Sequence, residues 1–152
     1  MIEEIKGDVF QAREKVLIHG CNCHNAMGSG VAKTIREIYP GAWLEDQKTT
    51  WGDKNKLGTF TSWSGKHAFY NQDITVINLY SQYKYGHTEV YADYNAIHDG
   101  LKQVEFVYRG ASFSMPRIGA GLARGDWATI KDIIKVVFTG YKANEVVRVY
   151  YL

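Results

Sequence analysis

Residues 15–22 read KVLIHGCN, an apolar run that closes on a polar, glycine-containing segment. Such a run is typical of a buried strand that ends in a loop. A helix is predicted to begin at Gly30, because apolar residues recur after it at helical spacing, at Val31, Ile35 and Ile38. Tyr39-Pro40-Gly41 supplies the stop. Strand, glycine loop and helix in this order indicate an α/β sheet, and the rest of the chain is interpreted from this unit.

Further strands are predicted on both sides of this unit. A short first strand precedes Gly7. The segments 57–63 and 73–80 are rich in β-branched and aromatic residues, which favours two strands. Residues 67–70, which lie between them, leave room for one more short strand.

The second half of the chain alternates between helical and extended patterns. One face of a long helix is predicted from five apolar residues spaced by four, three, four and three, namely Val90, Tyr94, Ile97, Leu101 and Val104. A strand follows at 111–115, and another at 145–152 ends the chain. Asp126 is a suitable N-cap for a helix between these strands, which carries Trp127, Ile130, Ile134 and Val137. We therefore expect a single domain over 1–152, a three-layer α/β/α fold with a central mixed, largely parallel sheet.

Composition limits the classes of function. The chain has 152 residues, of which 45% are hydrophobic, so it is long enough to bury a core and too short for two full domains. Its 18 basic and 16 acidic residues give a net charge of +2, so an anion must be bound locally and not by bulk charge. No apolar run approaches the roughly 18 residues that a membrane helix needs, and the first residues are acidic. We expect a cytoplasmic monomer that makes no contact with membranes.

Two glycine-containing segments follow predicted strands and precede predicted helices. Met27-Gly28-Ser29-Gly30 lies directly before a helix, where backbone amides and the helix dipole favour an anion. Ile118-Gly119-Ala120-Gly121-Leu122 has the same character. Each could instead be a plain structural turn, but two such loops at the carboxyl ends of strands predict a site for two adjacent phosphates.

Two polar residues near these loops each have two interpretations. Asp8 follows the first strand, where its carboxylate would accept a hydrogen bond from an exocyclic amine such as that of adenine. Alternatively, Asp8 forms a turn after Gly7. Asn22 suits a ribose hydroxyl, or else it only ties down its own loop.

The ionisable residues around the first loop also leave alternatives open. His19, Cys21, Cys23 and His24 contain the atoms that bind zinc, but they crowd one strand end, whereas zinc sites favour two separated pairs, so we expect no metal. Both cysteines are interpreted as buried, reduced thiols, although a cysteine nucleophile beside a histidine is an alternative. His19 is a candidate general base or a hydrogen-bonded strand residue. The segment from Tyr83 to His87 is expected at the same rim.

Three motifs together resemble the macrodomain family. They are Lys6-Gly7-Asp8-Val9, then Ile18-His19-Gly20-Cys21-Asn22-Cys23 running into Met27-Gly28-Ser29-Gly30-Val31-Ala32, and Met115-Pro116-Arg117-Ile118-Gly119-Ala120-Gly121-Leu122. Their order and spacing fit across nearly the whole chain, and the final Val147–Leu152 strand fits as well. Within the family, the chain looks most like the branch of ADP-ribose 1''-phosphate phosphatases and terminal ADP-ribose protein glycohydrolases. The His-x-Cys-Asn-Cys segment is similar to the phosphatases.

The resemblance implies ADP-ribose in a cleft at the strand ends, with no cofactor and no metal. Asp8 would bind the adenine amine, the two glycine loops would enclose the diphosphate, and Asn22 would meet the distal ribose. The implied ligand-binding residues are Gly7, Asp8, Val9, Gly20, Cys21, Asn22, Met27, Gly28, Ser29, Gly30, Val31, Arg117, Ile118, Gly119, Ala120, Gly121, Leu122 and Ala123.

The resemblance also implies catalytic candidates. In the phosphatase reading, His19 would orient or deprotonate the water that attacks the 1''-phosphate, beside Asn22. The glycohydrolase branch uses a lysine and an aspartate, for which the candidates are Lys84 and Asp126. This chain has Ala123 where that branch has its aspartate, and Asp126 is better explained as a helix N-cap. We therefore expect a phosphatase of ADP-ribose 1''-phosphate. The alternatives are a hydrolase that removes ADP-ribose from modified protein or nucleic acid, and a module that only binds ADP-ribose.

Overall fold

The central element of the structure, a computed structural model that describes residues 2–139 and 145–152, is a six-stranded sheet. The strand order is β1-β6-β5-β2-β4-β3, and every pair is parallel except β3 with β4. The strands are β1 (Ile2–Lys6), β2 (Val16–Asn22), β3 (Phe60–Lys66), β4 (Asp73–Gln82), β5 (Ser112–Pro116) and β6 (Val146–Tyr151). The mixed, largely parallel sheet that the sequence predicts is confirmed.

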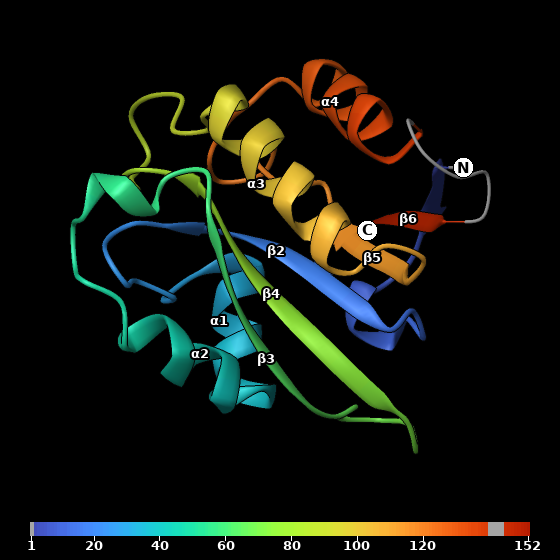
Figure 1. Cartoon of the computed structure of the whole chain (residues 1–152). Helices are drawn as coiled ribbons and strands as arrows, with labels where there is room; N and C mark the ends of the chain where they lie inside the picture. The colour runs from blue at the N-terminus through green and yellow to red at the C-terminus, as the bar shows by residue number, and fades with distance from the viewer. Residues whose placement is uncertain (1, 140–144) are drawn as a thin grey trace.

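Helices cover both faces of this sheet, as Figure 1 shows. One face packs against α1 (Gly30–Ile38) and α2 (Pro40–Gln47), and the other against α3 (Tyr94–Val107) and α4 (Trp127–Thr139). Strand β2 serves both layers, because alternate side chains point to opposite faces. Ile18 lies in the core under α3 and α4, whereas Leu17 lies in the core under α1 and α2. The three-layer α/β/α prediction is therefore correct.

Two predicted helix boundaries differ from the structure. Helix α3 begins at Tyr94 and not at Val90, because the Asp93 side chain accepts a hydrogen bond from the Ala96 amide at 3.0 Å and caps the helix there. Val90 lies outside the helix and is 59% exposed. The predicted stop at 39–41 ends α1 and also begins α2, since Pro40 occupies the first turn of α2.

The strand predictions in the middle of the chain need two corrections. Residues 67–70 form a turn and not a strand, with the His67 amide donating to the Gln72 carbonyl at 2.8 Å. Strand β3 begins at Phe60 rather than at 57, because Gly58 adopts φ +80° in a turn. Among the described helices, none has the length and apolar character to cross a membrane.

Candidate functional site

A cleft of about 850 Å³ opens at the carboxyl ends of the parallel strands. Its walls come from the segments that follow β1, β2, β4, β5 and β6. The lining residues are Gly7, Asp8, Val9, Phe10, Gly20, Cys21, Asn22, Ala26, Gly28, Ser29, Gly30, Val31, Ala32, Gln82, Tyr85, His87, Pro116, Arg117, Ile118, Gly119, Ala120, Gly121, Leu122, Ala123, Gly125, Trp127, Tyr150, Tyr151 and Leu152. Of the predicted ligand-binding residues, all but Met27 line this cleft, and Met27 is buried behind it.

The first glycine loop presents the amino end of α1 to the cleft. Gly30 adopts φ +61°, a left-handed conformation that glycine takes without steric cost. Ser29 precedes the helix, yet its side chain makes no capping hydrogen bond. The first-turn amides at Val31 and Ala32, both of which line the cleft, therefore receive no cap from Ser29, and their contact with an anion stays a prediction.

The second glycine loop is a compact turn between β5 and α4. The Gly125 amide donates to the Gly119 carbonyl at 2.7 Å, and the Arg124 amide donates to the Gly121 carbonyl at 3.0 Å. Gly119 adopts φ +74°, and a side chain there would meet the methyl carbons of Ile97 and Ile130. Gly121 has open space around it on the cleft side. The loop thus presents backbone alone to the cleft at this point.

Asp8 and Asn22 both line the cleft, and both also hold their own loops. Asp8 Oδ1 accepts a hydrogen bond from the Phe10 amide at 2.9 Å. Asn22 Nδ2 donates to the Ala26 carbonyl at 2.9 Å, and its Oδ1 accepts from the His24 amide at 2.9 Å. The structural interpretation of each residue is therefore correct, and contact with a ligand stays a prediction.

His19 does not reach the cleft. The imidazole has no exposed surface, and its Nε2 donates to Asn78 Oδ1 at 2.7 Å within the sheet. Burial lowers the pKa of His19 to about 4, and the hydrogen bond to Asn78 opposes that shift only in part. The prediction that His19 lies at the strand end was wrong, because His19 is in the middle of β2 and pairs with Asn78 of β4. Of the two interpretations of His19, the structure supports the hydrogen-bonded strand residue.

The two cysteines are free thiols in the apolar layer beside His19. Cys21 lines the cleft but is only 5% exposed, and its Sγ lies 3.6 Å from His19 Nε2. Burial raises the pKa of the Cys21 thiol well above its usual range. This environment disfavours a thiolate nucleophile. Among the described residues, no three His, Cys, Asp or Glu side chains are grouped to hold a metal ion.

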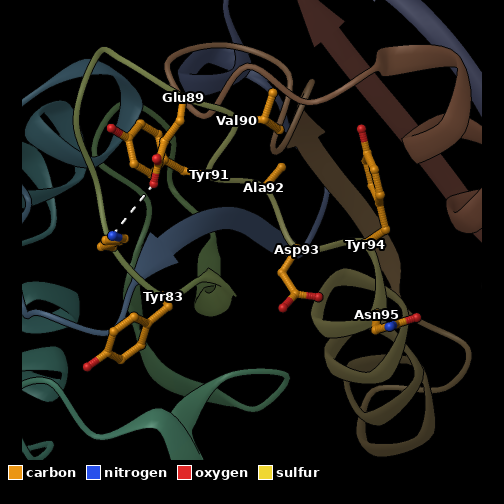
Figure 2. A pocket seen from close by; sticks show the side chains of 9 residues that line it. Tyr83, Glu89, Val90, Tyr91, Ala92, Asp93, Tyr94 and Asn95 are labelled. Atoms are coloured by element: carbon orange, nitrogen blue, oxygen red, sulfur yellow. Dashed lines mark ion pairs between the residues drawn. The ribbon is translucent and has the colours of Figure 1, made fainter.

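The structure does not bring the two glycohydrolase candidates together. Lys84 lines a separate pocket of about 520 Å³, shown in Figure 2, and its Nζ lies 3.6 Å from Glu89 Oε1. Asp126 is outside both lining sets and caps α4, because its Oδ2 accepts from the Thr129 hydroxyl at 2.7 Å and the Thr129 amide at 3.1 Å. These hydrogen bonds lower the pKa of Asp126. Asp126 is therefore the helix N-cap that its position in the sequence predicts, and a catalytic role for it beside Lys84 stays a prediction.

A buried polar cluster holds the loop between Asn22 and Gly30. Asn25 adopts a left-handed φ of 55°, and its Nδ2 donates to the Thr49 carbonyl at 3.0 Å. Lys56, only 8% exposed, donates from Nζ to Asn25 Oδ1 at 2.6 Å and to Thr49 Oγ1 at 3.0 Å. A charged donor thus fixes the turn that carries the first glycine loop.

Replacing Lys56 with methionine is expected to lower the free energy of unfolding by about 1–3 kcal/mol, because the partner oxygens lose their charged donor. Urea unfolding would measure this change. The matched control is Lys102→Met, at an exposed position on α3, with an expected change of about 0.5 kcal/mol or less. Equal stability of both variants would contradict the anchoring role of Lys56.

Comparison with known protein sequences finds one relative over most of the chain and several over short segments. No family model matches the chain. An uncharacterized 17.5 kDa protein of Enterobacteria phage T4 is 33% identical over 141 residues, which cover 88% of each chain. Shorter matches join ADP-ribose 1''-phosphate phosphatases of Ajellomyces capsulatus, 50% identical over 44 residues, and Candida albicans, 34% identical over 64 residues. These segments cover 28% and 39% of this chain and only 17% and 41% of the two phosphatases.

Solved structures give the same fold over the whole chain. The macrodomain of Mycobacterium tuberculosis DarG matches with a TM-score of 0.80 and 20% identity, covering 100% of this chain and 98% of that one. Thermosipho africanus DarTG, solved with ADP-ribose, matches with a TM-score of 0.77 and 16% identity, covering 98% of this chain and 41% of that one. Sheet order, cleft and glycine loops define an α/β/α domain of the kind that these neighbours represent. The chain therefore has the macrodomain fold, and the relative that it matches over most of its length is the uncharacterized phage T4 protein.

Proposed function

We propose that the chain binds ADP-ribose 1''-phosphate in the cleft and hydrolyses its terminal phosphate. The observation that carries this proposal is the pair of glycine loops that line the 850 Å³ cleft. The uncapped amino end of α1 and the bare backbone at Gly121 suit a diphosphate, because both offer approach to the backbone without a side chain in the way. A neighbour of the same fold was solved with ADP-ribose, which supports this choice of ligand.

The strand order supports one direction for the proposed ligand in the cleft. Asp8 follows β1 at one end of the sheet, and it is the proposed partner of the adenine amine. The glycine loops follow β5 and β2 in the middle and would bind the diphosphate. Asn22 and Gln82 are the last residues of the adjacent strands β2 and β4, so the distal ribose would lie at this end.

The short matches to named phosphatases support the phosphatase over the other hydrolases. In this reaction a water oxygen attacks phosphorus and the bond from phosphorus to the 1'' oxygen breaks. His19 is buried and lies outside the cleft lining, so it does not contact the attacking water. Any effect of His19 on catalysis would be indirect, through the residues of the sheet that it contacts. The groups that contact the phosphate must come from the lining.

One observation favours removal of ADP-ribose from a macromolecule as a second candidate. Lys84 directly precedes Tyr85, which lines the cleft, so this candidate requires the Lys84 amine to move from its own pocket towards the distal ribose. At present that amine faces Glu89 in the adjoining pocket. A lysine nucleophile would first have to leave this ion pair and lose a proton.

Phosphate release from ADP-ribose 1''-phosphate is expected to proceed equally with and without a chelator. Lys84→Ala is expected to keep the rate within about twofold, because Lys84 lines the other pocket. Release of inorganic phosphate measures both, in parallel with hydrolysis of ADP-ribosylated protein and nucleic acid. No turnover of any substrate, with ADP-ribose still bound, would make the chain a reader. Hydrolysis that Lys84→Ala abolishes would instead support the second candidate.

A further inference from the structure

The segment that connects β4 to α3 forms a wall between the cleft and the pocket of Figure 2. Gln82, Tyr85 and His87 line the cleft, whereas Tyr83, Lys84 and Glu89 line the pocket. Tyr85 is 59% exposed, and His87 is exposed as well. His87 is the one histidine among the described residues that lines the cleft. The sequence predicts this segment, Tyr83 to His87, at the rim, and Lys84 was the one catalytic candidate taken from it.

Hydrogen bonds attach this wall to the second glycine loop. The amides of Tyr91 and Ala92 both donate to the Ala123 carbonyl, at 2.8 and 3.2 Å. The Arg124 guanidinium donates from NH1 to the His87 carbonyl at 3.1 Å. Because Arg124 binds the backbone carbonyl of His87, it holds the backbone of His87 in place. The imidazole nitrogens of His87 are not used in this hydrogen bond. Three hydrogen bonds therefore connect the wall to the second glycine loop and Arg124.

The backbone of Arg124 is unusual in a way that bears on this contact. Arg124 adopts a left-handed φ of 61°, a conformation that costs an arginine free energy and glycine none. Strained backbone of this kind concentrates at functional sites, where the surrounding structure holds it in place. The hydrogen bond to His87 accounts for an arginine at this position. A glycine would adopt the left-handed backbone without strain, but it could not donate this bond to the wall.

We propose that His87 and Tyr85 form a subsite for the phosphate on the distal ribose, and that Arg124 is the positioning residue that holds His87 in it. This inference rests on the proposed function, which puts the distal ribose at the end where β2 and β4 finish. The His87 imidazole and the Tyr85 hydroxyl both offer hydrogen-bond donors, which suit the oxygens of a phosphate. The subsite thus distinguishes ADP-ribose 1''-phosphate from ADP-ribose, which lacks this group.

The variant Arg124→Gly removes the hydrogen bond that positions His87 without destabilising the fold, because glycine adopts the left-handed backbone without strain. We expect an unchanged or higher melting temperature. KM for ADP-ribose 1''-phosphate should rise about tenfold, and Kd for ADP-ribose should stay within about twofold. His87→Ala should give a similar loss, and Arg124→Lys, which keeps a cationic donor, should recover part of it.

A double-mutant cycle completes the test. If Arg124 acts through His87, the double variant Arg124→Gly with His87→Ala should lose no more than His87→Ala alone. Additive losses, or an unchanged preference for the 1''-phosphate in both single variants, would overturn the proposal while ADP-ribose binding still supported the function. A wild-type protein that binds neither compound would overturn both. Isothermal titration with ADP-ribose and phosphate-release kinetics provide the two readouts.

Discussion

Replacing Gly121 with phenylalanine is expected to abolish binding of ADP-ribose while the protein stays folded. A Cβ atom added at Gly121 would meet no heavy atom within 4 Å, and the backbone there is not left-handed. We therefore expect the fold to tolerate the substitution, with the ring extending into the cleft that Gly121 lines. Because the ring would occupy the space proposed for the diphosphate, we expect affinity to fall at least about 100-fold, equivalent to about 2.7 kcal/mol.

Isothermal titration with ADP-ribose measures the loss, and the melting temperature checks the fold. Gly121→Ala is the size control, with an expected change of only a few fold. Gly119→Ala is the contrasting variant, because φ +74° and contacts of 3.0 and 3.1 Å to Ile97 and Ile130 should lower stability as well. Undiminished affinity in folded Gly121→Phe would show that the ligand does not use the second glycine loop.

Local patterns were sufficient where a feature depends on few neighbours. The end of β2 and the start of α1 follow from an apolar run and a glycine loop, and Asp126 caps α4 as its position predicts. Helix α2 escaped notice because it buries only Ala42 and Asp46, which is too few to produce an apolar periodicity. Val90 matched the spacing of α3 by chance, since the cap at Asp93 begins the helix.

In the site, too, features set by neighbouring residues could be predicted from the sequence, whereas contacts between distant residues could not. Glycine loops are visible in the sequence because glycine before a helix has a direct physical meaning. The burial of His19 depends on Asn78, which is 59 positions away and lies beside it only once β2 pairs with β4. The contact of Arg124 with His87 likewise joins two loops that are far apart in the sequence. Strand pairing, and not composition, decides which ionisable residues reach the cleft.

The buried imidazole of His19 makes stability depend on pH. In the unfolded chain its pKa is near the ordinary 6.5, and in the folded protein burial lowers it to about 4. Between these values the unfolded chain binds a proton that the folded protein rejects. The stability that neutral, buried His19 allows is therefore fully present above about pH 6.5. The free energy of unfolding falls as the pH drops from there towards 4. From the size of the shift, the loss reaches roughly 3 kcal/mol.

His19→Gln isolates this effect, because glutamine retains an amide donor for Asn78 Oδ1 but does not titrate. We expect the variant to be less stable at pH 7, where wild-type His19 is neutral and well packed, and to lose less stability on acidification. Urea unfolding measures the free energy of unfolding of both proteins from pH 7 to pH 4. In the difference between the two, the contribution of the carboxylates cancels, because both proteins contain the same carboxylates. His98→Gln, at a partly exposed histidine on α3, should follow the wild type much more closely. Parallel curves for wild type and His19→Gln would contradict the neutral, buried state of His19, and would return it to the candidates for proton transfer.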